Sequence, residues 1–228
     1  MFAAAGADAM LIFQFDGALA ATSAQDFVTE LLVRRIGAAG VVTGDDFTFG
    51  TRRGGNPMVL RDVGAAHGLI AETVAPVALD GVPVSSSRAR EALVAGDPGT
   101  ATHLLTRPFA IQGVVEHGAK LGRTLGWPTA NLVLGSYLRP AYGIYAVRVR
   151  LADGTEHDGV ASLGIRPSIE PPVELLEAVL FDFDGDLYGQ TIEVALVHYL
   201  RPEAKFDSLA ALKQQMDADA DAARRLLA

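Results

Sequence analysis

The stretch YGIYAVRVRL, residues 142–151, decides how the second half of the chain folds. Apolar residues alternate in it with arginines, and successive side chains of an extended strand point to opposite sides. The alternating apolar residues are Tyr145, Val147, Val149 and Leu151. The pattern therefore predicts a strand with one face turned towards an apolar core.

Further strand-length segments lie on both sides of this one. They are residues 109–115, 156–165, 175–183 and 191–200. Turn signals such as Asp153-Gly154 separate them, and several short antiparallel strands in succession favour a small β-barrel. The chain ends in an expected helix capped by Asp207 or Ser208. Its apolar stripe, which should pack on the barrel, is Leu209, Leu212, Met216, Ala220, Ala223 and Leu227.

The first half of the chain has a different hydrophobic pattern. Apolar segments of strand length (10–15, 41–44 and 70–79) alternate with helical patterns, of which the clearest opens at Ser23 and stops at Gly37. Strands that alternate with helices predict a parallel α/β unit. The rhythm changes near Thr106-Arg107-Pro108, so we expect one domain over residues 1–106 and a second over residues 107–228.

Composition excludes several classes of protein. The chain has 228 residues, half of them hydrophobic, with a net charge of -8 and no basic stripe, which argues against nucleic acid as a partner. It has no cysteine, so disulfides, thiolate metal sites and cysteine nucleophiles are excluded. The N-terminus lacks a basic signal-peptide region, and no apolar run of about 18 residues occurs. We therefore expect a cytoplasmic protein with no membrane partner and no obligatory protein partner.

The segment GVVEHGAKLGRTLGWPTANL, residues 113–132, carries the most unusual chemistry. Its glycines allow a backbone to approach a phosphate closely, and Lys120 and Arg123 among them can meet phosphate oxygens. Thr129 and Asn131 are two residues apart, so in an extended backbone their oxygens point to the same side. Mg²⁺ accepts such ligands when nucleotide phosphates supply the remaining charge. The alternative is a glycine-rich hairpin loop in which Thr129 and Asn131 satisfy backbone groups.

Glu177 interrupts an apolar row. It shares its strand face with Leu175, Val179, Phe181 and Phe183. A carboxylate in such a row is costly to bury unless it has a partner or a use, so Glu177 is a candidate catalytic base. The alternative is a glutamate at a strand end that reaches solvent.

The segment FDFDGDLYGQ, residues 181–190, resembles a calcium loop in the spacing of its aspartates. Its sixth position is Leu187 where such a loop needs glycine, and the flanking segments are strands. The sequence therefore favours a hairpin turned at Asp184-Gly185.

The stretch GRTLGWPTANL resembles the signature of the riboflavin kinase family, which reads approximately G-[RK]-x-L-G-x-P-T-A-N. The resemblance continues in order through GIYAVRV, LGIRPS, FDFDGDLYG and YLRPEAKFDSLAALKQQMDAD, and covers nearly all of residues 109–228. It implies a six-stranded antiparallel β-barrel with a C-terminal helix. It also implies phosphorylation of riboflavin to FMN with ATP and Mg²⁺.

The resemblance also implies roles for individual residues. Thr129 and Asn131 would hold Mg²⁺ and the nucleotide phosphates. Gly118, Lys120 and Arg123 would cover ATP. Glu177, eleven residues before Tyr188, would be the catalytic base. The family usually has His two residues after this glutamate, where this chain has Val179, a change that we expect to tune activity without abolishing it.

The first half resembles the FMN adenylyltransferase module that precedes the kinase in bacterial bifunctional FAD synthetases. The resemblance lies in VVTGDDFTFGTRRGG (41–55) and VSSSRAREAL (84–93). It implies an incomplete Rossmann-like nucleotidyltransferase unit with a phosphate-handling loop, formed by Ser86, Ser87, Arg88 and Arg90.

The His-x-Gly-His loop of that module is absent, and the Phe-Asp-Gly at 15–17 is followed by Ala18-Leu19-Ala20. We therefore expect the chain to start partway into the module, with adenylyltransferase activity weak or lost. The alternatives to a riboflavin kinase are a bifunctional enzyme that also makes FAD and a non-catalytic module that binds flavin or nucleotide.

Overall fold

The computed structural model describes residues 2–118, 127–166 and 173–228. The chain divides into two compact units, Met1–Pro83 and Val84–Ala228.

The long helix of the first unit begins and ends where the sequence predicts. It runs as an α-helix over Ala24–Asp26 (α2) and continues as a π-helix over Phe27–Ile36 (η2). The Ser23 hydroxyl caps its start by accepting a hydrogen bond from the Asp26 N–H at 3.0 Å. Gly37 ends it with a φ of 70°, a conformation that glycine adopts readily.

The parallel α/β arrangement predicted for this unit is also confirmed. Strands β1 (Gly40–Gly44) and β2 (Ile70–Val74) pair in parallel, and helix α3 (Pro57–Ala65) lies between them in the chain. Val28, Leu32, Phe49, Leu60 and Leu69 form the core beneath them. The remaining elements are η1 (Ala3–Ala5), α1 (Gly17–Ala21), η3 (Thr51–Arg53) and the short antiparallel pair β3 (Ala78–Leu79) and β4 (Val82–Pro83).

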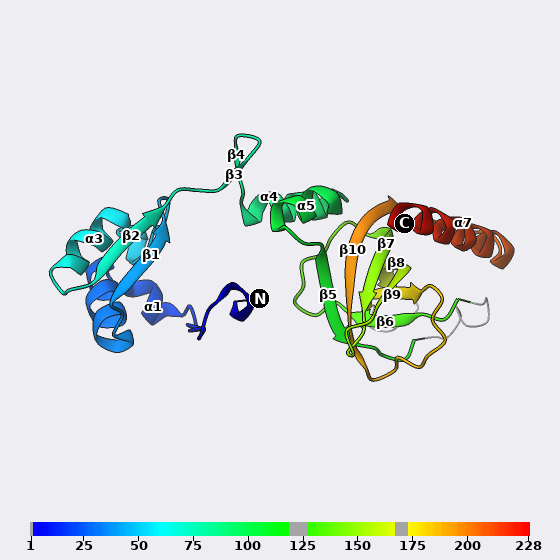
Figure 1. The fold of residues 1–228 in the computed structure, drawn as a ribbon, viewed down its shortest axis with the longest axis horizontal. Coiled ribbons are helices and arrows are strands. Elements are labelled where there is room, and N and C mark those ends of the chain that lie inside the picture. The colour runs from blue at the N-terminus through cyan, green and yellow to red at the C-terminus, as the bar shows by residue number, and fades with distance from the viewer. Residues whose placement is uncertain (1, 119–126, 167–172) are drawn as a thin grey trace. The chain divides into compact units, whose positions relative to one another are not determined.

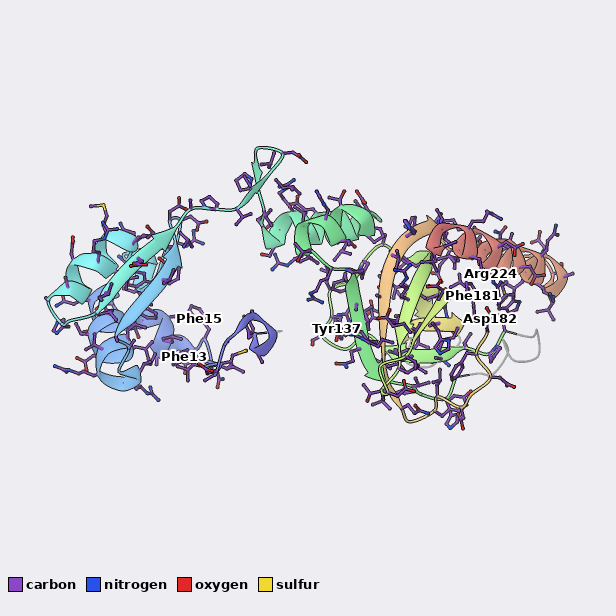
Figure 2. All side chains as sticks on the ribbon, viewed as in Figure 1. Phe13, Phe15, Tyr137, Phe181, Asp182 and Arg224 are labelled. Carbon is purple, nitrogen blue, oxygen red and sulfur yellow. The ribbon has the colours of Figure 1, made fainter. Side chains whose placement is uncertain are left out.

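The strand predicted over residues 10–15 is wrong. This segment is irregular, and Ile12 and Phe15 are 80% and 81% exposed. Figure 2 shows Phe13 and Phe15 on it. A strand needs a neighbour to satisfy its backbone groups, and in the described residues β1 and β2 pair only with each other.

The second unit opens with two helices, α4 (Ser86–Val94) and α5 (Pro98–Leu105), which pack against each other. Helix α5 also contacts the strands that follow, and the Ala141 N–H donates to the Leu93 carbonyl at 2.9 Å. Contacts thus group residues 84–105 with the strands, whereas the sequence reading placed them in the first domain. The functional division at 106/107 stays a prediction.

Six antiparallel strands then form the barrel, in the spatial order β5-β10-β7-β8-β9-β6. Their bounds are β5 Phe109–Val114, β6 Ala130–Val133, β7 Gly143–Arg150, β8 Glu156–Arg166, β9 Val173–Leu180 and β10 Thr191–Arg201. A bridge between Glu116 and Asn131 joins the chain just after β5 to β6, so the sheet nearly closes (Figure 1). The predicted barrel is confirmed.

The alternation in β7 places its apolar face in the barrel core. Tyr145, Val147 and Val149 are at most 1% exposed and pack with residues from every other strand of the barrel. Strand β10 alternates less cleanly because its register shifts between Leu196 and His198 and again before Arg201. Such bulges turn neighbouring side chains to a different face.

Helix α7 (Leu209–Leu227) packs on the outside of the barrel, as predicted, and Ser208 caps it. Its last three stripe residues are buried against the sheet, and the Arg224 guanidinium lies 4.1 Å from the centre of the Phe181 ring (Figure 2). No helix in the described ranges is long and apolar enough to cross a bilayer.

The hairpin predicted at Asp184-Gly185 is wrong. Strand β9 pairs with β8 and β6, whereas β10 pairs with β5 and β7, so residues 181–190 connect two strands that are not neighbours. The aspartates and glycine of this segment indicated a turn, but local sequence does not tell which strands a turn joins. Within the described ranges, no group of three or more acidic or histidine side chains is placed to hold a metal.

The barrel core yields a stability prediction. Leu132 is fully buried in β6, so Leu132→Ala should lower the free energy of unfolding of the barrel by about 2–5 kcal/mol. Its neighbour Val133 is 41% exposed, and Val133→Ala should change the free energy of unfolding by about 0.5 kcal/mol or less. Urea unfolding followed by the fluorescence of Trp127, the single tryptophan, measures both. Equal effects of the two variants would contradict this packing.

Candidate active site

A single row of side chains crosses the outer face of the barrel. The strand register pairs Asn131 with Glu177, Glu177 with Ser162, Ser162 with Ile144 and Ile144 with Arg201. Directly paired residues point to the same side, with Cβ atoms roughly 5 Å apart. The residues on either side of Glu177 in β9 are Leu176 and Ala178, and both belong to the barrel core. The row therefore lies on the face opposite the core.

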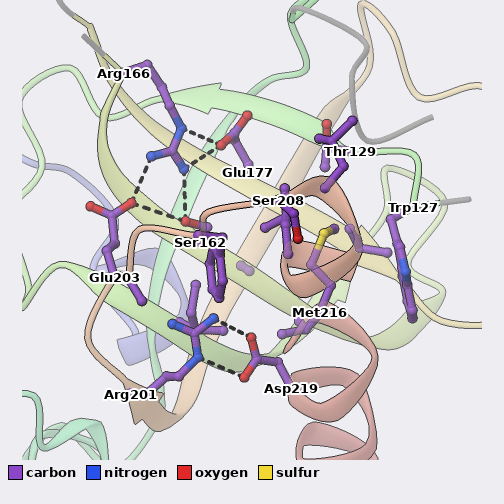
Figure 3. A pocket seen from close by; sticks show the side chains of 18 of the residues that line it. Trp127, Thr129, Ser162, Arg166, Glu177, Arg201, Glu203, Ser208, Met216 and Asp219 are labelled. Atoms are coloured by element: carbon purple, nitrogen blue, oxygen red, sulfur yellow. Dashed lines mark hydrogen bonds and ion pairs between the residues drawn. The ribbon is translucent and has the colours of Figure 1, made fainter. Parts of the chain in front are cut away.

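A cavity of about 570 Å³ lies over this row (Figure 3). Its other wall is the segment from Glu203 to Ser208 together with the first half of α7. Leu212 and Met216, predicted as part of the packing stripe of α7, line this cavity. A volume of this size suits a small organic molecule.

The cavity brings together residues that the sequence singled out separately. Thr129 and Glu177 both line it, and Asn131 is the cross-strand partner of Glu177. Thr129 also lines a second cavity of about 390 Å³, whose other walls include Pro128 and residues 183–188. The segment Pro128–Asn131 thus lies between two cavities. The Glu177 carboxylate is one strand away from it, on β9.

The Asn131 amide is held in one orientation. Its Nδ2 donates to the carbonyl oxygens of Thr129 at 3.4 Å and Glu116 at 3.5 Å. Its Oδ1 is buried and has no hydrogen-bond partner in the described part of the chain. Gly118 lies against this amide, since a Cβ there would sit 2.6 Å from Nδ2. A buried acceptor without a partner calls for an explanation, and a hard cation is a suitable one.

Glu177 is not isolated among apolar side chains, as its row in the sequence suggested. It forms an ion pair with Arg166, which also donates to Glu203 at 2.8 Å and to the Ser162 hydroxyl at 2.8 Å. Figure 3 shows this network. Burial lowers the pKa of Arg166, but its hydrogen bonds and charge interactions with Glu203 and Glu177 outweigh burial and raise that pKa above its usual value.

A second ion pair closes the other end of the cavity. Arg201 at the end of β10 donates two hydrogen bonds to the Asp219 carboxylate of α7, at 2.9 and 2.6 Å. Asp219 is 6% exposed and also accepts from Gln215. This pair ties α7 to the barrel, and Arg201 contributes to the wall of the cavity.

Trp127 forms part of the cavity wall just before the segment Pro128–Asn131, which leads into β6. Its indole N–H donates to Asp217 of α7 at 3.1 Å, and Lys213 pairs with the same carboxylate. The Lys213 hydrogen bond, with a smaller contribution from Trp127, holds the pKa of Asp217 below its ordinary value. These contacts hold Trp127 in the cavity wall.

The other predicted residues are not brought into this site. Ser86, Ser87, Arg88 and Arg90 lie on the first turns of α4 and line neither of the two cavities. Lys120 and Arg123 lie outside the described residues.

The sequence reading missed Arg166 and Glu203. Both lie within stretches that carry the family resemblance, LGIRPS and YLRPE, so the signal was present but assigned to no role.

A carboxylate and a threonine that line a cavity of this size, with an oriented amide on the neighbouring strand, are typical of an enzyme that acts on small molecules. A family model described as riboflavin kinase matches residues 105–227, and one described as FAD synthetase matches residues 1–88. These matches leave α4 and α5 largely between them.

Curated relatives agree with these models. The bifunctional riboflavin kinase/FMN adenylyltransferase of Haemophilus influenzae is 41% identical over 95% of this chain and 70% of its own length. The Pseudomonas fluorescens protein of the same name is 43% identical over 98% of this chain and 72% of its own length. The chain belongs to the bifunctional riboflavin kinase/FMN adenylyltransferase family.

A solved structure shares the fold. It is described as a macrolide-efflux protein from Streptococcus pneumoniae, with a TM-score of 0.80 and 33% identity over 92% of this chain and 68% of that one. This likeness extends over both units of the chain.

Proposed function

We propose that the barrel unit is a riboflavin kinase, which transfers the γ-phosphoryl group of ATP to riboflavin and releases FMN and ADP. The observation that carries this proposal is the pairing of Asn131 with Glu177 across neighbouring strands. It puts a metal-type oxygen ligand and a potential proton acceptor side by side, and phosphoryl transfer to an alcohol needs both.

Glu177 acts as the general base. The terminal hydroxyl of the ribityl chain attacks the γ-phosphorus, and its proton passes to the Glu177 carboxylate. As the new O–P bond forms, the bond between the γ-phosphorus and the β–γ bridging oxygen breaks, and ADP leaves. One Glu177 oxygen, Oε2, accepts the hydrogen bond from Arg166 Nε and forms the ion pair with Nη2, and Oε1 has no partner in the described ranges and is available for the proton.

Thr129 and Asn131 are the residues that would hold Mg²⁺. The buried Asn131 Oδ1 without a partner fits this role, as does the close approach of Gly118 to the same amide. Held there with the nucleotide, the ion would neutralise phosphate charge during transfer.

The two cavities fit the two substrates. The larger has apolar walls that include Trp127, Val179 and Met216, which suit a flat aromatic ring system, and Glu177 lies on its floor. The smaller meets it at Thr129 and suits the nucleotide. Riboflavin in the first and ATP in the second would therefore meet beside Thr129. Val179, where the family usually has His, becomes part of the flavin-facing wall.

Removal of the base should stop turnover without removing the binding site. Glu177→Gln keeps the shape of the side chain, so we expect kcat to fall by about 10²–10⁴-fold while riboflavin binding, followed by flavin fluorescence, changes little. Glu174→Gln is the matched control, because Glu174 lies on the same strand and also pairs with an arginine, Arg139. A Glu177→Gln variant with normal turnover would rule out this mechanism.

Disturbing the Asn131 amide should affect the use of the metal. Asn131→Ala removes the oxygen, and Gly118→Ala displaces it by placing a methyl group against the amide. We expect each to raise the Mg²⁺ concentration for half-maximal rate by about 10–100-fold. Val133→Ala, two residues further along the same strand, should leave it unchanged. A magnesium titration of the initial rate measures this concentration. Unchanged titrations for both Asn131→Ala and Gly118→Ala would show that the Asn131 oxygen is not a metal ligand.

The adenylyltransferase reaction is the second candidate function, favoured by the FAD synthetase match over residues 1–88. The 228 residues contain no His-x-Gly-His segment to stabilise the phosphoryl group under attack. With riboflavin, ATP and Mg²⁺, this polypeptide should therefore accumulate FMN and form little FAD, as chromatography of the flavins would show. FAD formation at a rate close to that of FMN would contradict this expectation.

A further inference from the structure

The role of Arg166 emerges from the number of bonds it makes around the cavity. All three guanidinium nitrogens are engaged: Nε and Nη2 with Glu177, Nη1 with Glu203, and Nη2 also with the Ser162 hydroxyl. Its side chain is 22% exposed. A planar guanidinium fixed at every nitrogen is a rigid group, because rotation about its terminal torsion would break several bonds together.

The fold makes room for this arrangement. On the outer face of β8 the alternate residues are Ser162, Gly164 and Arg166, and the Glu203 carboxylate lies directly over Gly164. Any side chain at this glycine would overlap that carboxylate. The missing Cβ at Gly164 thus leaves room for Glu203 in the position from which it reaches Arg166, and a side chain there would require the carboxylate to shift.

We propose that Arg166, held from the other side by Glu203, is the positioning residue for the Glu177 base, an inference that rests on the proposed kinase function. Arg166 binds Oε2 of Glu177 and thereby fixes the direction in which Oε1 points. A base that must take a proton from one hydroxyl gains rate from being held at one angle, and a displacement of about 1 Å can lower the rate by about 10²-fold.

Glu203 has a distinct part in this design. When Glu177 takes up the proton, its charge is lost, and a half-buried arginine with a neutral partner would be left with an unbalanced charge. The hydrogen bond of 2.8 Å to Glu203 provides a second carboxylate that stays with Arg166 in both states. Arg166 can then stay in place through the reaction cycle.

A double-mutant cycle tests the proposal. Arg166→Met removes the hydrogen bonds and keeps an unbranched side chain of similar reach, and Arg166→Lys restores the charge with a single donor group. Each variant is made in the natural chain and in Glu177→Gln, and phosphoryl transfer is followed in single turnovers. Arg139→Met is the matched control, because Arg139 pairs with Glu174 on the same strand but lines neither cavity.

We expect Arg166→Met to lower kcat by about 10–100-fold with the riboflavin dissociation constant within about threefold of that of the natural chain. Arg166→Lys should recover part of the loss, and Arg139→Met should lower kcat less than about threefold. In the Glu177→Gln background, Arg166→Met should change the rate by less than about twofold, because a residue that acts through Glu177 has nothing left to position. Glu203→Gln should lower kcat in the same direction by a smaller factor.

The outcomes distinguish a failure of the proposed kinase function from a failure of the inference about Arg166. If Glu177→Gln turns over normally, the proposed function fails, and the inference fails with it. If Glu177→Gln is inactive but Arg166→Met is as active as the natural chain, the inference alone fails. An equal loss from Arg166→Met in both backgrounds, or a loss confined to riboflavin binding, would also overturn it, because Arg166 would then act on a substrate directly. An unchanged kcat in Glu203→Gln would remove Glu203 from the network.

Discussion

The register between strands β6, β9 and β8 is the constraint on which the site depends. It places Asn131, Glu177 and Ser162 in one row on the outer face of the barrel. A slip of one residue would turn Glu177 into the core position that Leu176 or Ala178 now occupies, because side chains alternate along a strand. The apolar residues inside the barrel therefore determine where the polar chemistry outside it lies. Burying an unpaired carboxylate in that core is unfavourable by enough to exclude the slipped register.

Helix α7 makes a cavity out of this exposed row. The second half of the helix is fixed by Ala220, Ala223 and Leu227 against the barrel, and its middle by the bidentate bonds from Arg201 to Asp219. The first half does not pack on the sheet in the same way, and its apolar residues face the cavity. One continuous stripe thus serves two purposes: its C-terminal part stabilises the fold, and its N-terminal part provides an apolar wall for a ligand.

The sequence predicted features that depend on residues close together in the chain and did not predict those that depend on distant segments. Period-two alternation predicted the barrel strands because it is a local property of an extended chain. The placement of the Thr129 and Asn131 oxygens on one side stays a prediction. Pairing between distant segments has no such signature. The hairpin at Asp184-Gly185 was wrong for this reason, as was the strand over residues 10–15, for which no paired neighbour lies in the described residues. Arg166, Glu177 and Glu203 meet only after three segments have packed, and an isolated arginine at a strand end gave no hint of its two carboxylate partners.

The charges of the described site also bear on how it would handle a triphosphate. Each arginine that lines the larger cavity is matched by a carboxylate: Arg166 by Glu177 and Glu203, and Arg201 by Asp219. The described lining of the smaller cavity contains Asp184 and Asp186 and no lysine or arginine. Neither cavity thus offers a surplus of positive charge from these side chains. A nucleotide triphosphate carries several negative charges, so its binding here requires cations from another source. The proposed Mg²⁺ at Thr129 and Asn131, together with the predicted contacts from Lys120 and Arg123, would supply this positive charge. The charge balance of the two cavities is therefore a reason to expect the nucleotide to depend on these four residues.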